Sequence, residues 1–190
     1  MKGLEFDAEK HEYFLNGVKM MSVSDILQPL TASMYSGIDP LTLANAARRG
    51  TRIHELCELM DYDALPDEFE AELLPYVSAY RTFKRDYGVK EWRAVEMQVA
   101  CPHLGLAGTI DREGEIDGNF CLVDIKTGAS VAKKRLAVQI TAYTRIIHSN
   151  IHDLYGLHLK KDGSYHFSRV KRQNKVFEAC LDIAKYLRRR

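Results

Sequence analysis

The segment GTIDREGEIDGNFCLVDIKTG, residues 108–128, constrains the fold more strongly than any other part of the sequence. Two extended runs flank the dipeptide Asp117-Gly118, which favours the type I′ turn of a two-residue β-hairpin. In the register that this turn imposes, Asp111 lies directly opposite Asp124. Like charges at opposed positions destabilise a strand pair. The segment therefore predicts a hairpin whose two carboxylates need compensation.

A divalent cation between the two aspartates would compensate their repulsion. Lys126 lies two residues beyond Asp124, so both side chains point to the same face of the strand. This pattern predicts a metal site with an ammonium group at its rim. The alternative is a surface hairpin in which Lys126 forms a salt bridge with either aspartate. The run CLVDIK is too apolar for a free surface strand, because Cys121, Val123 and Ile125 point to the other face, into a core.

Hydrophobic periodicity predicts the elements around this hairpin. An N-terminal hairpin turns at Asn16-Gly17, a short helix begins at Ser24-Asp25, and a loop covers 29–39. The other predicted helices span 41–60, 67–87 with Gly88 as its stop, 133–149 and 173–187, and the other predicted strands span 92–100, 106–114, 119–127, 153–160 and 164–170.

This order of elements predicts an α/β fold, in which a mixed central β-sheet contains the aspartate hairpin and is flanked by helices. No internal repeat or Ser/Gly-rich linker interrupts the 190 residues, so we expect one domain over 1–190, with an N-terminal hairpin and loop (1–39) and a core (40–190). The four cysteines form no CxxC pair and are predicted to be reduced core residues. The acidic N-terminus and the absence of a long apolar run predict a cytoplasmic protein without membrane contact.

The predicted helix 41–60 carries a second group of candidate residues. Gly50, His54 and Glu58 follow one another at helical spacing, so they share one stripe beside the apolar face. A glycine inside a helix costs about 1 kcal/mol relative to alanine, which is easiest to understand if something packs closely there. The alternative is a core histidine with a surface glutamate.

Two further elements contribute polar candidates. Gln139 falls among the apolar residues of the predicted helix 133–149, near Tyr143, and a glutamine on an apolar face needs hydrogen-bond partners. The alternative is a glutamine at the wet edge of the stripe. Glu96, in the predicted strand 92–100, is either a further carboxylate near the metal or an exposed residue of an edge strand.

In chain order these features read G-x-x-x-H-x-x-x-E, a strand glutamate, G-T-I-D, D-I-K-T-G and Q-x-x-x-Y. The combination, over residues 50 to 143, resembles the PD-(D/E)XK nuclease superfamily, and within it the RecB-like exonuclease branch. The N-terminal hairpin followed by a helix start resembles the small phage and prophage members of that branch.

The resemblance implies roles for these residues. His54, Asp111, Asp124 and the backbone carbonyl of Ile125 would ligate Mg²⁺ or Mn²⁺. Lys126 would position or activate the attacking water and stabilise the pentavalent phosphate. The remaining candidates would lie near the DNA or the metal: Gln139 and Tyr143 as the QxxxY motif, with Glu96 and Glu58 at less strictly required positions.

The sequence departs from the family pattern in two places. Ile110 stands where the proline of the family name would be, and the second acidic residue is Asp124 rather than glutamate, which the pattern permits. Some relatives hold an Fe–S cluster with cysteines grouped near the C-terminus. Only Cys180 lies there in this chain, so we expect no cluster. The chain also lacks a GxxxxGK[ST] loop and is expected to use no ATP.

The resemblance implies a Mg²⁺- or Mn²⁺-dependent deoxyribonuclease, most simply an exonuclease in phage recombination or DNA repair. A structure-specific endonuclease and a catalytically silent DNA-binding subunit are the alternatives. A strand-annealing protein or a helicase would be natural partners, and an oligomer is compatible with the family. Charge agrees with a nucleic-acid partner, because residues 96–190 hold 16 basic and 10 acidic residues. The basic tracts 133–135, 160–161 and 169–172 could hold a phosphate backbone, or could be ordinary solvated faces.

Overall fold

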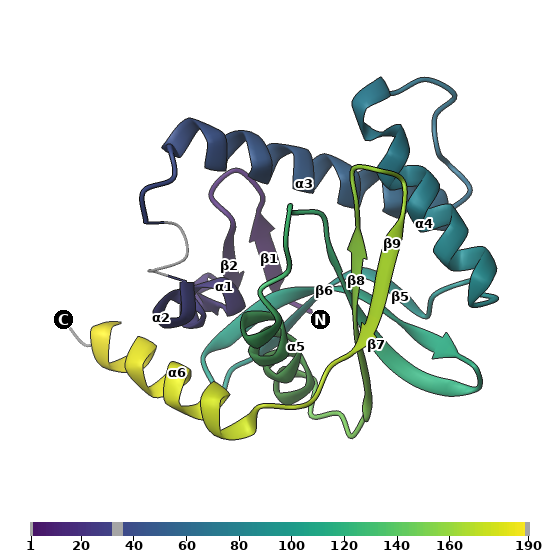
Figure 1. The fold of residues 1–190 in the computed structure, drawn as a ribbon. Coiled ribbons are helices and arrows are strands. Elements are labelled where there is room, and N and C mark those ends of the chain that lie inside the picture. Colours follow the sequence, from purple (N-terminus) through teal and green to yellow (C-terminus); the bar gives the residue numbers. More distant parts are fainter. Residues whose placement is uncertain (1, 32–35, 189–190) are drawn as a thin grey trace.

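The computed structural model describes residues 2–31 and 36–188 (Figure 1). Its strands are β1 (Leu4–Asp7), β2 (Glu12–Leu15), β3 (Val18–Lys19), β4 (Met21–Ser22), β5 (Ala94–Cys101), β6 (Leu106–Ile116), β7 (Asn119–Lys126), β8 (Asp153–Leu159) and β9 (Tyr165–Arg169). Its helices are α1 (Val23–Ile26), α2 (Gln28–Thr31), α3 (Pro40–Asp61), the 3₁₀ helix η1 (Ala71–Leu73), α4 (Leu74–Asp86), α5 (Lys133–Ile146) and α6 (Asn174–Arg188).

The central sheet is mixed and has six strands. β6 pairs antiparallel with β5 along one edge, while its other edge pairs first with β4, in parallel, and then with β7, antiparallel. β7 continues the sheet through β8, in parallel, to β9. Because β4 reaches only to Ala107 and the β7 ladder begins at Arg112, residues 108–111 form a fork in the sheet. The fork leaves this stretch of β6 without a strand neighbour on that edge.

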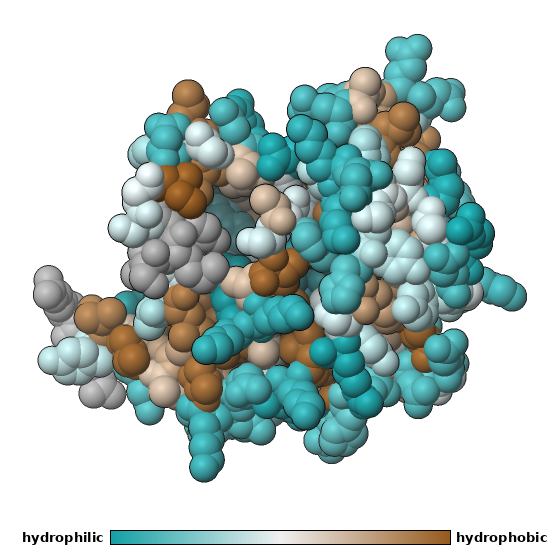
Figure 2. Space-filling view, in the orientation of Figure 1, coloured by the Kyte–Doolittle hydropathy of each residue, from teal (hydrophilic) through white to brown (hydrophobic). Residues whose placement is uncertain are grey.

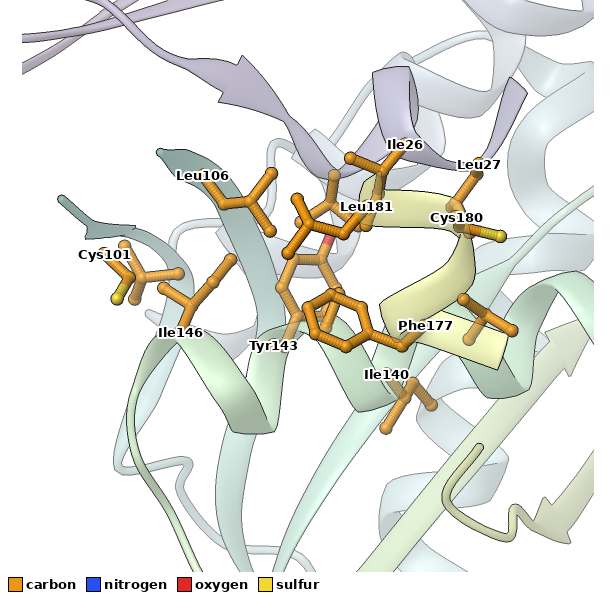
Figure 3. Packing of buried hydrophobic residues seen from close by; sticks show 14 of the residues in the cluster. Ile26, Leu27, Cys101, Leu106, Ile140, Tyr143, Ile146, Phe177, Cys180 and Leu181 are labelled. Atoms are coloured by element: carbon orange, nitrogen blue, oxygen red, sulfur yellow. The ribbon is translucent and has the colours of Figure 1, made fainter. Parts of the chain in front are cut away.

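Helices cover the sheet in two layers. In one layer α5, α6 and α1 enclose a core that includes Leu106, Ile140 and Tyr143 (Figure 3). The other layer consists of α3 and α4, which cover the opposite face of the sheet. On that face Cys121, Val123 and Ile125 are buried, as their alternation along the strand predicts. All four cysteines are buried and free, which confirms their assignment to the core. No helix of the described chain is long and apolar enough to span a bilayer.

The turns follow the local sequence. Asp117 and Gly118 have φ values of 50° and 75°, as a type I′ turn requires, and Ile116 pairs with Asn119 in the predicted register. Asn16 and Gly17 turn the N-terminal hairpin in the same way. Gly88, with φ of 60°, ends α4: its amide donates to the Arg85 carbonyl, and the next amide donates to the Lys84 carbonyl.

The predicted α/β fold, with a mixed central sheet flanked by helices, is confirmed. Several boundaries and one strand were predicted wrongly. β1 was missed, although it completes a three-stranded sheet with β2 and β3. The first short helix is capped by Ser22, whose hydroxyl accepts from the Asp25 amide, and not by Ser24. The predicted loop 29–39 contains the end of α2, and its residues 32–35 lie outside the described part.

Two of the helices that flank the sheet, α4 and α5, also differ from the prediction, mainly at one end each. Helicity expected from 67 begins only at η1, because the segment 67–70 after Pro66 is irregular. α5 ends at Ile146 instead of 149, where His148 takes a positive φ of 50° and the Ser149 amide donates back to the Thr144 carbonyl. Both differences are end effects, which periodicity defines poorly.

A buried ion-pair network joins α3 and α4 to the sheet. Arg112 of β6 is fully buried, and its Nε donates to Asp61 of α3 (2.7 Å) and to the Tyr80 hydroxyl of α4 (3.1 Å). Its Nη1 donates to Glu96 of β5 (2.9 Å). Lys84 also pairs with Asp61 at 2.7 Å. Breaking such a pair costs far more than breaking an exposed one, because the remaining charge stays desolvated.

We predict that Arg112→Met lowers the free energy of unfolding by about 3 to 5 kcal/mol, because it leaves Asp61 and Glu96 without their shared cation. Chemical denaturation monitored by circular dichroism measures this change. Arg93→Met is the matched control: Arg93 is exposed and reaches Glu113 only at 3.8 Å, so its loss should cost less than about 1 kcal/mol. Equal costs for the two variants would contradict a structural role for the network.

Candidate metal centre

Three carboxylates lie at one level of the central sheet. In the β5–β6 register Glu96 falls opposite Asp111, and in the β6–β7 register Asp111 falls opposite Asp124. At both places the regular backbone pairing is interrupted at this level. The fork in the sheet explains part of the interruption, since the Ile125 amide donates to the Asp111 carboxylate (2.6 Å) instead of to a strand carbonyl. The carboxyl group of Asp111 is thereby fixed between the diverging strands.

Glu96 stands in an unusual backbone conformation. Its φ is 44°, in the left-handed region, which is strained for a residue with a side chain. The side chains before and after Glu96 also pack in different cores. Met97 and its strand partner Ile110 pack in the core under α5, whereas Val95 packs under α4. Residues two apart on a regular strand would share one face. The kink at Glu96 therefore directs its carboxylate toward Asp111 and α3.

His54 of α3 completes the group. Its Nδ1 lies 3.2 Å from Glu96 Oε1 and 3.8 Å from Asp111 Oδ2. One ligand atom from each of these three residues lies within 4.8 Å of the other two. The glycine one turn earlier, Gly50, has one close neighbour, since a Cβ there would meet Thr127 Oγ1 at 3.4 Å. An alanine would thus just make contact, and the close packing expected at this glycine is limited to that hydroxyl.

The electrostatics of the group reflect its crowding. Burial, reinforced by the charge of Asp124, raises the pKa of Asp111 from 3.8 to about 7. Burial acts to lower the pKa of His54, but the carboxylates of Asp111 and Glu96 outweigh it and raise that pKa above 6.5. The pKa of Glu96 is lowered, because its contacts with His54 and Arg112 outweigh the effect of burial. The group therefore favours positive charge placed among its oxygens.

Asp124 and Lys126 lie beside this group rather than inside it. The Lys126 ammonium forms an ion pair with Asp124 Oδ2, while Oδ1 has no partner among the described residues. Asp124 is 2% exposed, so Oδ1 is a desolvated acceptor without a donor. Lys126 is half-buried and faces the cavity in front of Asp111.

Gln139 and Tyr143 project from α5 toward the same place, one helical turn apart. The Gln139 amide donates to the Tyr143 hydroxyl at 3.4 Å, and Gln139 Oε1 has no partner among the described residues. Burial raises the pKa of Tyr143 well above its usual range, so the phenol keeps its proton and can donate a hydrogen bond. Gly108 permits this approach, because a Cβ there would lie 2.9 Å from the Tyr143 ring.

These side chains surround a cavity of about 460 Å³. Figure 2 shows the surface hollowed below α3, with both hydrophilic and hydrophobic side chains at the edge of the hollow. Glu58 lines the cavity but is not one of the three residues whose ligand atoms converge. Ile125, whose carbonyl the resemblance implies as a ligand, contacts the group through its amide.

The sequence did not point to two contributors to this cavity. Arg112 supports Glu96 from behind; its position directly after Asp111 was its only signal in the sequence. The N-terminal hairpin supplies a wall: Phe6 stacks on Tyr13 with ring centroids 4.6 Å apart, His11 packs edge-on against both, and the Tyr13 hydroxyl bonds Thr109. The β2–β3 turn at Asn16-Gly17 was predicted, but β1, which carries Phe6, and the docking of these strands beside the fork were not.

The residues present fit a hard divalent cation. The donor set offers carboxylate oxygens and one imidazole nitrogen, which suits Mg²⁺ and suits Mn²⁺ better where the histidine takes part. Asp124 Oδ1, buried and without a partner among the described residues, is the kind of acceptor that a cation would satisfy. No described cysteine joins the three residues, which disfavours a zinc or iron–sulfur donor set.

No protein-family model and no curated protein matches the chain. Its fold is similar to the crystal structure of a candidate exonuclease from Eubacterium rectale, with 12% identity and a TM-score of 0.54 over 88% of this chain and 77% of that one. An alkaline exonuclease from Laribacter hongkongensis aligns over 90% of this chain and 92% of its own, with 13% identity and a TM-score of 0.46. At such identities the first likeness shows the fold alone.

The raised pKa of Asp111 yields a prediction about stability. In the presence of EDTA, ionising Asp111 is unfavourable in the folded state, so its contribution to stability falls as pH rises from 3.8 to about 7. Asp111→Asn keeps an oxygen for the Ile125 amide and removes this penalty. The variant should match the wild type near pH 4 and exceed it by about 1 kcal/mol or more at pH 8, measured by urea denaturation. A variant less stable than the wild type at pH 8 would contradict the proposed crowding.

Proposed function

We propose that this chain is a divalent-metal-dependent deoxyribonuclease of the PD-(D/E)XK kind, acting as an exonuclease. The observation that carries the proposal is the convergence of His54, Glu96 and Asp111 beside the Asp124–Lys126 ion pair. Phosphodiester hydrolysis needs a positively charged centre for the phosphate and a group that handles the attacking water, and this arrangement offers both. The fold shared with the candidate exonuclease from Eubacterium rectale is consistent with it.

In this proposal Mg²⁺ or Mn²⁺ would be held by Asp111, Asp124 and His54, with the Ile125 carbonyl. Glu96 serves as an additional ligand or orients His54, to which it is hydrogen-bonded, and Glu58 is a more distant acid at the rim. When bound, the cation supplies Lewis acidity and neutralises the charge that develops on the phosphate. No Fe–S cluster and no ATP take part.

The chain's own residues would share the remaining work. The Lys126 ammonium, held beside Asp124, can position the attacking water and stabilise negative charge on the phosphate oxygens. The Tyr143 hydroxyl keeps its proton and can donate to a phosphate oxygen, while Gln139 orients that hydroxyl. The partnerless Gln139 Oε1 offers an acceptor to water or a nucleotide. The backbone around Asp111 fixes these groups on strands and helices rather than on loops.

In this proposal the substrate is DNA. The resemblance to the RecB-like branch favours a role in phage recombination or DNA repair. A strand-annealing protein or a helicase would then be its partner. A structure-specific endonuclease would use the same residues, so it remains the second candidate. A silent DNA-binding subunit is disfavoured by the intact set of Asp111, Asp124 and Lys126.

We predict metal-dependent release of nucleotides from linear DNA and no cutting of covalently closed circles, measured with purified protein in Mg²⁺, Mn²⁺ or EDTA. Lys126→Ala should lower the rate by about 100-fold or more, because the charge beside the phosphate is lost. Lys90→Ala removes an exposed lysine from the segment that follows α4. It is the matched control and should retain the wild-type rate.

Three outcomes would decide among the candidates. Cutting of closed circles would favour the endonuclease. DNA binding without cleavage in either metal would favour the silent subunit. Cleavage that is unchanged in Lys126→Ala, or that persists in EDTA, would refute the assignment of the site.

A further inference from the structure

A second cavity, of about 470 Å³, adjoins the candidate metal centre. It lies between the start of α5 and the β8–β9 hairpin, on the face shown in Figure 2, where hydrophilic side chains cover the hairpin. Four of its lining residues are permanent cations besides Lys126, and none is acidic: these are Lys133, Lys160, Arg169 and Lys171. Clefts lined by one sign of charge concentrate ligands of the opposite sign.

These cations are poorly neutralised by the protein itself. Arg169 pairs with Asp153, but Lys133, Lys160 and Lys171 form no ion pair with any described residue. The first turn of α5 adds to the positive potential, because it contains no acidic residue and its N-cap, Ala132, supplies no side-chain hydrogen bond. An anion in the cavity would relieve both the repulsion among the lysines and the unsatisfied helix start.

The sheet connects this cavity to the metal centre. Lys126 lines both cavities. It falls opposite His158 in the β7–β8 register, and His158 falls opposite His166 in the β8–β9 register, so a row of nitrogen-bearing side chains crosses three strands. This row lies two residues along β7 from Asp124, or about 7 Å at the rise of a strand. That separation is comparable to the spacing of successive phosphates along a nucleic acid strand.

We propose that this cavity, the basic cavity, binds internal backbone phosphates of the DNA strand that is being cut, next to the scissile phosphate. The inference rests on the proposed function and adds to it the path of the strand: from the metal centre, past Lys126, between α5 and the β8–β9 hairpin. Contacts between lysines and phosphates do not distinguish the bases, so we expect this binding to be independent of the DNA sequence.

The test measures DNA binding separately from cleavage. Fluorescence anisotropy in EDTA gives the Kd of the full chain for a labelled oligonucleotide at several salt concentrations. Lys160→Ala/Lys171→Ala should raise Kd by about tenfold near 0.1 M salt and flatten the dependence of log Kd on log salt by about 1 to 2, because each lost phosphate contact removes roughly 0.7 to 0.9 from the slope.

A matched control separates local contacts from net charge. Lys90→Ala/Lys185→Ala removes the same charge from residues that line neither cavity, and it should change Kd by less than about twofold. Both double variants should keep the wild-type thermal midpoint. If the control weakens binding as much as the cavity variant, or if neither does, the basic cavity is not a phosphate site.

Oligonucleotides with and without a 5′-phosphate distinguish the source of the anion. Internal phosphates predict the same loss of affinity for both in the cavity variant. A loss confined to the 5′-phosphorylated oligonucleotide would overturn the proposal in favour of a terminal-phosphate pocket. These outcomes do not depend on catalysis, so an absence of metal-dependent cleavage in the wild type would refute the proposed function without deciding this inference.

Discussion

Repulsion among carboxylates at one level of a buried sheet is the constraint on which the candidate site depends. Glu96, Asp111 and Asp124 follow one another across three strands, and the burial of Asp111 removes the water that would otherwise screen them. Two basic side chains offset this repulsion: His54 lies beside Glu96, and Lys126 lies beside Asp124. In the proposed function, a divalent cation supplies the remaining positive charge that these oxygens require.

The surrounding structure holds these groups against their repulsion. Arg112, buried on the far side of β6, ties Glu96 to α3 and α4. The left-handed backbone at Glu96 persists because the residues on either side of it, Val95 and Met97, are paired with β6. The fork in the sheet supplies the other condition, because the Ile125 amide is free to hold the Asp111 carboxylate. The strained backbone of Glu96 and the crowded carboxylates therefore both lie where the regular pairing of the sheet stops.

Local rules allowed much of this to be predicted. The Asp117-Gly118 turn set the β6–β7 register, which brought Asp111 and Asp124 to one level, and helical spacing brought Gln139 and Tyr143 to one face. The convergence of separate elements could not be predicted this way. Periodicity does not reveal that α3 crosses the sheet at Glu96, that the strand kinks there, or that Arg112 is paired inside the core, because these depend on packing between distant segments. β1 was missed because a four-residue strand carries too little pattern.

The central claim is that the crowded carboxylates and His54 hold one divalent cation for catalysis. Anomalous diffraction from crystals soaked in Mn²⁺ tests it most directly. The account predicts a manganese peak between Asp111 and Asp124 within coordination distance of His54, and the loss of that peak in Asp111→Asn. A crystal in which manganese binds elsewhere, or in which Lys126 bridges the two aspartates and no metal enters at saturating Mn²⁺, would contradict it.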